Sequence, residues 1–237
     1  QASTLALLTL ASASSSLAID PFATPRDIVV QSWTKRDGLP SNAVQCIEAS
    51  PDGYIWIGTE KGLTRFDGVR FVTLDPQRFP LLENAAINDL SVTKSGLLYI
   101  QTFTGSLLYD GVQVVTITVR GRPGVPVRRV KRGSNKEMWG VFDGGIGKIE
   151  AHELVPLEWP SLQGLGSDLE LIGSGDDNRL LVVNARGLFL VDERSATAVT
   201  WEDGKQVVEP VFIYAPGGGL WIGTDGEGLG TWDGRVV

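Results

Sequence analysis

The chain has 237 residues, 42% of them hydrophobic, with 29 glycines, 12 prolines and 7 tryptophans, a composition typical of a turn-rich all-β protein. A formal net charge of −7 and a pI near 4.8 give a surface that repels nucleic acid and anionic lipid, so neither is an expected partner. The single cysteine, Cys46, cannot form an internal disulfide and is expected to pack as a small apolar residue.

Residues 1–18 predict the remnant of a signal peptide. Residues 2–18 carry no charge, include an apolar run, and end in Ser-Leu-Ala, a sequence that suits a signal peptidase. The stretch is too short and too rich in serine to span a membrane, and a disordered tail is the alternative. Because the chain begins with Gln1, we expect that the basic start of the signal is missing. Export to the periplasm follows from this interpretation.

Residues 19–41 are interpreted as a lead-in loop and, at residues 28–33, a strand that closes a ring of sheets. Five copies of a repeat follow, and the sequence Trp-Ile-Gly-Thr marks the first at residues 56–59 and the last at residues 221–224. The copies lie about 40 residues apart, a period typical of propeller blades or of two-helix repeats. The five positions that align the copies, here called the anchors, are Trp56, Tyr99, Trp139, Leu181 and Trp221.

The residues around each anchor favour the propeller. Short apolar runs beside glycine predict buried strands, and no segment has a helical period. Turn pairs such as Asp67-Gly68 predict hairpins. The predicted fold is therefore all-β, a β-propeller of four-stranded antiparallel blades. The blades are predicted at residues 42–75, 86–118, 127–157, 168–200 and 207–237. The predicted structural core of the repeats comprises Trp56, Gly58, Tyr99, Trp139, Trp221 and Gly223.

The first copy resembles the two-component regulator propeller repeat. The resemblance rests on residues 33–44 (WTKRDGLPSNAV), on residues 52–59 (DGYIWIGT) and on residues 62–68; it fades in copies two to four and returns at residues 218–234. In that family, such repeats form the periplasmic sensor region of membrane receptors that end in a histidine kinase or a diguanylate cyclase. The resemblance implies an N-terminal fragment with five blades of a seven-bladed ring. A closed ring of five blades is the alternative.

Two places are candidates for ligand binding. The first is the face that gathers the long loops at residues 36–42, 75–85 and 120–126, because loops on a rigid scaffold carry recognition residues. The second is the channel lined by the first strand of each blade, where polar residues stand eleven positions before the anchors. Flanking apolar residues Val44 and Ile47 are three apart, which predicts a bulge at this point. The predicted ligand-binding residues are Arg36, Asp37, Asn42, Lys61, Asn88 and Arg128.

One segment of this acidic chain is strongly basic. Its cations could bind a carboxylate or sulfate group, as in a uronate-containing glycan, or could pair with acidic residues of a neighbouring blade. Both interpretations stay open on sequence alone. The cations are Arg120, Arg122, Arg128, Arg129, Lys131 and Arg132.

The sequence is compatible with three classes of function. A sensor would bind an extracellular small molecule or oligosaccharide, neutral or anionic, as part of a homodimeric receptor that meets the membrane only through a later segment. A scaffold would bind proteins through exposed aromatic residues, for which Trp159 and Trp201 are candidates. A propeller lyase or hydrolase is less favoured, because His152 is the single histidine and no nucleophile elbow or glycine-rich phosphate loop occurs. We therefore expect no catalytic residues, no cofactor and no metal.

Overall fold

The computed structural model describes residues 30–133, 137–174, 179–208, 211–214, 220–224 and 228–232. The chain forms two compact units, Gln1–Trp33 and Thr34–Val237. Most of the first unit, including the predicted signal peptide and residues 28–29, lies outside the described residues. Residues 30–33 form no strand, so the predicted closing strand is not observed in this described part of residues 28–33. Among the described residues, no helix has the length and apolar character to cross a membrane.

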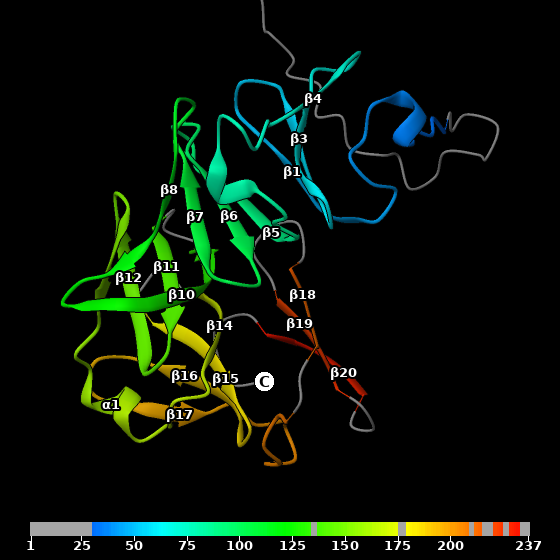
Figure 1. Ribbon diagram of the computed structural model, residues 1–237. Helices are drawn as coiled ribbons and strands as arrows, with labels where there is room; N and C mark the ends of the chain where they lie inside the picture. The colour runs from blue at the N-terminus through cyan, green and yellow to red at the C-terminus, as the bar shows by residue number, and fades with distance from the viewer. Residues whose placement is uncertain are drawn as a thin grey trace, which may run out of the picture. The chain divides into compact units, whose positions relative to one another are not determined.

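The second unit is built from antiparallel sheets that follow one another along the chain (Figure 1). Sheet 1 contains β1 (Val44–Ala49), β2 (Ile55–Thr59), β3 (Gly62–Phe66) and β4 (Phe71–Thr73). Sheet 2 contains β5 (Ile87–Val92), β6 (Leu98–Thr102), β7 (Ser106–Tyr109) and β8 (Val114–Thr116). Sheet 4 contains β14 (Glu170–Ser174), β15 (Leu180–Asn184), β16 (Gly187–Val191) and β17 (Ala196–Ala198). In all three, the strand order follows the sequence, as the repeat predicted.

Sheets 3 and 5 differ from this pattern. Sheet 3 contains β10 (Arg122–Arg132), β11 (Met138–Phe142), β12 (Gly145–Glu150), β13 (Glu153–Pro156) and the short β9 (Thr118–Val119). In sheet 5 the described strands are β18 (Val211–Tyr214), β19 (Leu220–Thr224) and β20 (Gly228–Trp232). Short helices are η1 (Lys35–Asp37), η2 (Pro80–Leu82) and α1 (Pro160–Gln163). The all-β architecture of four-stranded antiparallel sheets is thus confirmed.

The extra strand β9 closes sheet 3 on itself. It pairs antiparallel with β10 and parallel with β13, so that sheet 3 forms a small closed barrel. The Arg120 main-chain N–H donates to the Leu154 carbonyl over 2.8 Å, and the Arg120 guanidinium lies 2.7 Å from Glu153. The predicted loop at residues 120–126 is therefore wrong from Arg122 onward. The segment extends because its main-chain groups find partners in β9.

Tight turns join the strands at the Asp-Gly pairs. Asp67 Oδ1 accepts hydrogen bonds from the main-chain N–H groups of Val69, at 2.8 Å, and Arg70, at 2.7 Å. These bonds lower the pKa of Asp67 below its ordinary value. Gly68 follows with a φ of +95°, a conformation that glycine adopts without strain. The aspartate and the glycine together fix the hairpin that the sequence predicted.

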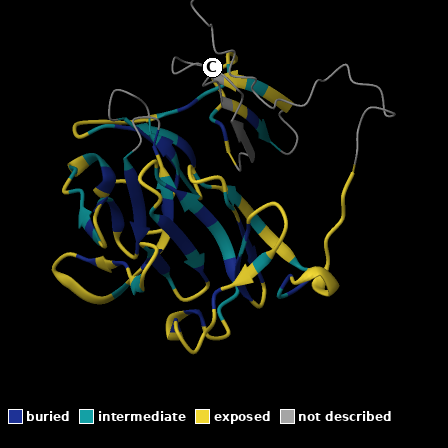
Figure 2. Ribbon diagram, turned by 90° about the horizontal axis from the view of Figure 1, so that it is seen from above, coloured by how far each residue is buried: buried dark blue, intermediate teal, exposed yellow. Residues whose placement is uncertain are grey.

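The hydrophobic core lies between consecutive sheets, whereas the turns and loops are mostly exposed (Figure 2). The anchor residue of each of the first four sheets shares a buried cluster with residues of the following sheet. Such clusters hold the sheets together by removing apolar surface from water. Each of the four clusters contains one such pair: Trp56 with Ile87, Tyr99 with Val130, Trp139 with Leu171, and Leu181 with Ile222.

Gly58 of sheet 1 lies close to the side chain of Ile87 in sheet 2. A Cβ atom on this residue would stand 2.5 Å from Cys46 Sγ and 2.6 Å from a methyl carbon of Ile87. Carbon atoms in a packed core make contacts at about 3.5 Å or more. The close approach therefore accounts for glycine at this position of the repeat.

Three aromatic residues depart from their predicted environments. Trp221 is 41% exposed, so its predicted core position is wrong. The anchors face the following sheet, and the described residues contain no sheet that follows β20. Trp159 and Trp201, considered as exposed aromatic residues for a scaffold, are half-buried and pack against the third and fourth clusters. Gly223 is half-buried as well.

Candidate functional site

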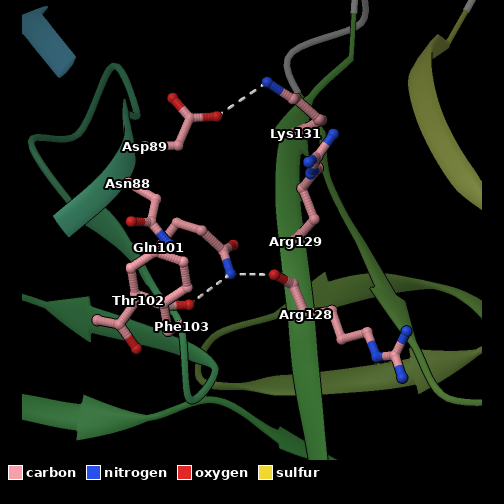
Figure 3. Close-up of a pocket in the computed structure, with 8 residues that line it drawn as sticks. All are labelled: Asn88, Asp89, Gln101, Thr102, Phe103, Arg128, Arg129 and Lys131. Atoms are coloured by element: carbon pink, nitrogen blue, oxygen red, sulfur yellow. Dashed lines mark hydrogen bonds and ion pairs between the residues drawn. The ribbon is translucent and has the colours of Figure 1, made fainter. Parts of the chain in front are cut away.

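An open groove of about 440 Å³ lies between sheet 2 and strand β10 of sheet 3 (Figure 3). Its walls come from the start of β5, the end of β6 and the middle of β10. Polar and charged side chains dominate this lining, and one aromatic ring stands among them. The lining residues are Asn88, Asp89, Gln101, Thr102, Phe103, Arg128, Arg129 and Lys131.

A bulge recurs at the same position in β1, β5 and β10, and the bulges of β5 and β10 lie at the groove. The register shifts between Val44 and Cys46 in β1, between Ile87 and Asp89 in β5, and between Val127 and Arg129 in β10. The residues left without a partner are thus Gln45, Asn88 and Arg128, which confirms the bulge predicted from the apolar spacing. An extra residue bends a strand and redirects its side chains. The bulge lets neighbouring residues, such as Asn88 and Asp89, line one groove.

In β14 the shift lies two positions later, between Leu171 and Gly173. Glu170, which was predicted to be equivalent to Asn88 and Arg128, therefore pairs regularly with Val183. The fourth copy is one of those in which the resemblance fades, so its alignment with the first copy was poorly constrained by sequence.

Gln101 joins the two walls of the groove. Its side-chain amide donates a hydrogen bond to the main-chain carbonyl of Arg128. Its Oε1 atom lies 2.9 Å from Ser106 Oγ, which in turn lies 2.8 Å from the Val127 carbonyl. These polar contacts link β6 and β7 to β10, so the groove rests on a hydrogen-bonded floor and its shape is preformed.

Three cations of β10 form ion pairs with carboxylates from three sheets. Lys131 Nζ lies 2.9 Å from Asp89 of β5, Arg129 pairs with Glu170 of β14, and Arg128 pairs with Asp143 in the turn after β11. The side chains in these pairs are 35% to 56% exposed, so each pair contributes about 0–1 kcal/mol. Pairing with neighbouring acids, one of the two interpretations of the basic segment, is therefore present.

The Arg128 side chain extends away from Gln101 (Figure 3), toward its partner Asp143. Its contribution to the groove is the main-chain carbonyl that accepts from Gln101. Arg129 and Lys131 also line the groove, and the Lys131 ammonium is directed at Asp89 (Figure 3). With the one lining carboxylate, Asp89, they leave the lining of the groove with an excess of positive charge.

Phe103 stands out because its side chain is 84% exposed. Its ring lies beside Asn88 and Gln101 in Figure 3. A flat apolar ring next to amide groups suits a ligand that has both an apolar face and polar edges. Phe103, Thr102 and Gln101 were not predicted from the sequence. Gln101 could have been noticed in the sequence. It stands two residues after the anchor Tyr99, so a polar residue replaces the glycine that the first copy has at this position, Gly58.

The other predicted ligand-binding residues lie outside this groove. Asp37 caps η1 by accepting a hydrogen bond from the main-chain N–H of Thr34 at 2.7 Å, and Asn42 accepts from the N–H of Lys35 at 2.8 Å. Both side chains therefore shape the lead-in loop, where Arg36 is exposed. Lys61 is exposed in the turn between β2 and β3. The structure thus brings together Asn88 and Arg128, but not Arg36, Asp37, Asn42 and Lys61.

Groups suited to chemistry are sparse in the described part of the chain. Its residues include no cluster of three or more histidine, cysteine or carboxylate side chains that could hold a metal ion. The Cys46 thiol is half-buried, and burial raises its pKa to about 11, so it stays protonated near neutral pH. The eight lining residues of the groove comprise amides, ions, one hydroxyl and one aromatic ring, a set that suits binding.

Comparisons with known proteins agree on the fold. Residues 38–61 match the family described as the two component regulator propeller, which confirms the resemblance found in the sequence. A search among curated proteins gave no match. Two solved structures are similar to this chain, the extracellular domains of two proteins described as hybrid two-component systems of B. thetaiotaomicron. Each is 19% identical to this chain in sequence, with a TM-score of 0.63. The matches cover 83% and 82% of this chain but 27% and 30% of those chains, so the chain spans less than a third of their length.

An enzyme shares the fold as well. The virginiamycin B lyase of Staphylococcus aureus is 15% identical, with a TM-score of 0.54, and the match covers 80% of this chain and 69% of the lyase. At these identities the similarity extends to the fold alone. The function must therefore be argued from the site.

Proposed function

Because residues 38–61 carry a two-component regulator propeller repeat, we propose that the chain is the ligand-sensing propeller of an exported two-component-type receptor. The observation that carries this proposal is the preformed polar groove between β5, β6 and β10. The chain supplies five blades of a seven-bladed ring. The remainder of the receptor anchors it in the inner membrane, makes it a homodimer, and ends in a histidine kinase or a diguanylate cyclase.

The position of the groove supports a sensing role. Asn88, Asp89 and Gln101 belong to sheet 2, whereas Arg129 and Lys131 belong to sheet 3, so a ligand in the groove contacts two repeats at once. A ligand changes a receptor only if it binds one arrangement more tightly than another. A site shared by two sheets meets this condition, because a small change in their packing alters every contact with the ligand.

A lyase is the second candidate, favoured by the shared fold with virginiamycin B lyase. Acid and base catalysis needs a group that can gain and lose a proton near neutral pH, and histidine is the usual choice. The groove lining offers no histidine. His152 lies instead in the turn between β12 and β13, on the outer part of sheet 3. The binding role therefore fits the groove better than catalysis does.

Thermal denaturation tests the proposal. The purified protein is heated with neutral and acidic oligosaccharides, amino acids and small organic acids. A ligand of the native state at a hundred times its Kd stabilises it by about 2.7 kcal/mol, so a sensor should show a clear rise in Tm with one class of compound. A protein that unfolds at the same temperature with every compound would favour a scaffold instead.

Two variants place the binding compound in the groove. Phe103→Ala removes an exposed ring of the lining, so it should abolish the rise in Tm while leaving the Tm of the free protein unchanged. Lys61→Ala alters an exposed residue outside the groove and should leave the response intact. Equal responses in both variants would mean that the compound binds elsewhere.

A further inference from the structure

Two cations of β10 that line the groove form ion pairs across both boundaries of sheet 3. Lys131 pairs with Asp89 across the boundary between sheets 2 and 3, at 2.9 Å. Arg129 pairs with Glu170 across the boundary between sheets 3 and 4. The strand β10 thus carries ion pairs to both neighbouring sheets, and the cation of each pair lines the groove that we assign to the ligand.

These links are exposed enough to be exchanged. The side chains of Lys131 and Asp89 are 35% and 38% exposed, and those of Arg129 and Glu170 are 44% and 47% exposed. Water therefore reaches all four charges and screens their attraction. An anionic group entering the groove would meet cations that are held only loosely by their present partners.

The chemistry of the two cations selects the ligand. A guanidinium binds a carboxylate through two parallel hydrogen bonds, and an ammonium attracts the same group as a point charge. Two cations on alternate residues of one strand lie on the same side of it, about 7 Å apart along the backbone. A ligand with two or more carboxylates on a short frame can reach both.

Resting on the proposed function, we propose that the groove binds a small polycarboxylate, which displaces Asp89 from Lys131 and Glu170 from Arg129. The exchange removes one ion pair at each boundary of sheet 3, while the hydrogen bonds of Gln101 and Ser106 to β10 and the hydrophobic clusters between the sheets stay in place. Ligand binding would thereby loosen sheet 3 against sheets 2 and 4. This is the local change that a receptor could transmit.

The proposed exchange predicts that some substitutions at the site increase the affinity for the ligand. If the two protein carboxylates compete with the ligand, removing them should strengthen binding. Citrate is the probe, measured by isothermal titration calorimetry at low ionic strength. Asp89→Asn and Glu170→Gln should each raise the affinity for citrate about 3-fold to 10-fold, whereas Arg129→Gln should lower it about 10-fold or more, in the range of single charge contacts.

Asp143→Asn is the matched control. It removes a carboxylate from the third ion pair of β10, but its partner Arg128 points away from the groove. Its affinity for citrate should equal that of the unaltered protein, which separates competition from a general change in net charge. Circular dichroism and the Tm of the free proteins check that each variant is folded.

Unchanged or weaker binding of citrate to Asp89→Asn and Glu170→Gln would overturn the exchange. So would the absence of citrate binding in all of the proteins. If a neutral compound still raises the Tm in the thermal screen, the proposed function stands and only the anionic ligand is excluded. If no compound of any class binds, the sensing role fails as well.

Discussion

Replacing Trp56 with alanine should lower the free energy of unfolding by about 3–5 kcal/mol, the usual range for removing a large buried aromatic side chain. The ring is 6% exposed and shares a cluster with residues of sheet 2. It also meets the ring of Tyr109 edge to face, with centroids 5.6 Å apart. Denaturation by urea, followed by circular dichroism, measures the loss.

The second copy of the same tetrapeptide provides the control. Trp221 occupies the corresponding position but is 41% exposed, so Trp221→Ala should cost at most about 2 kcal/mol. Comparable losses in the two variants would mean that Trp221 is buried in solution. A stable Trp56→Ala protein would contradict the packing of sheet 1 on sheet 2.

Replacing Gly58 with alanine should destabilise the protein by about 1–3 kcal/mol, the usual cost of overpacking a core. The added methyl group would overlap Cys46 Sγ and the side chain of Ile87, so sheets 1 and 2 must move apart to admit it. The loss should appear as a lower Tm.

Gly164→Ala is a suitable comparison for this substitution. Gly164 has a φ of −74°, and no atom lies within 4 Å of a Cβ built on it, so alanine fits there without strain. Its Tm should stay within a degree or so of the unaltered value or rise slightly, because alanine restricts the unfolded chain. A Gly58→Ala protein as stable as Gly164→Ala would show that the close approach does not exist.

Sequence alone predicted the repeat, the strand character and the bulges, because each depends on local pattern. The apolar spacing around Gln45 is three instead of two, and β1, β5 and β10 all shift register there. The Asp-Gly pairs predicted hairpins for a similar reason, since aspartate supplies the hydrogen-bond acceptor and glycine the positive φ. Most of the fold could therefore be predicted from the repeat period and from the residues of the turns.

What sequence missed depends on contacts between distant segments. Periodicity shows that Trp221 faces one side of its sheet, but not whether a neighbour covers that side. The two-residue strand β9 is too short to leave a pattern, and its pairing with β13 is a tertiary contact. The groove combines β5, β6 and β10, so the sequence indicated Asn88 and the cations of the basic segment but not the residues of β6 that complete the lining.

The basic segment shows the same limit. Sequence left ligand binding and ion pairing as alternatives for its cations, and the structure pairs Arg128, Arg129 and Lys131 with acids. The three acids lie on three different sheets, and the Arg128 side chain extends away from Gln101 (Figure 3) toward Asp143. Which acid each cation meets depends on the neighbouring sheets.

The central claim is that a ligand binds in the groove between sheets 2 and 3. Hydrogen–deuterium exchange at short labelling times, with and without the compound that gives the largest rise in Tm, tests it most directly. Exchange should slow in Ile87–Val92, in Leu98–Thr102 and in the 127–132 part of β10, and stay unchanged in Lys35–Asp37. Slower exchange confined to the lead-in loop at residues 36–42, with β5, β6 and β10 unaffected, would contradict the claim.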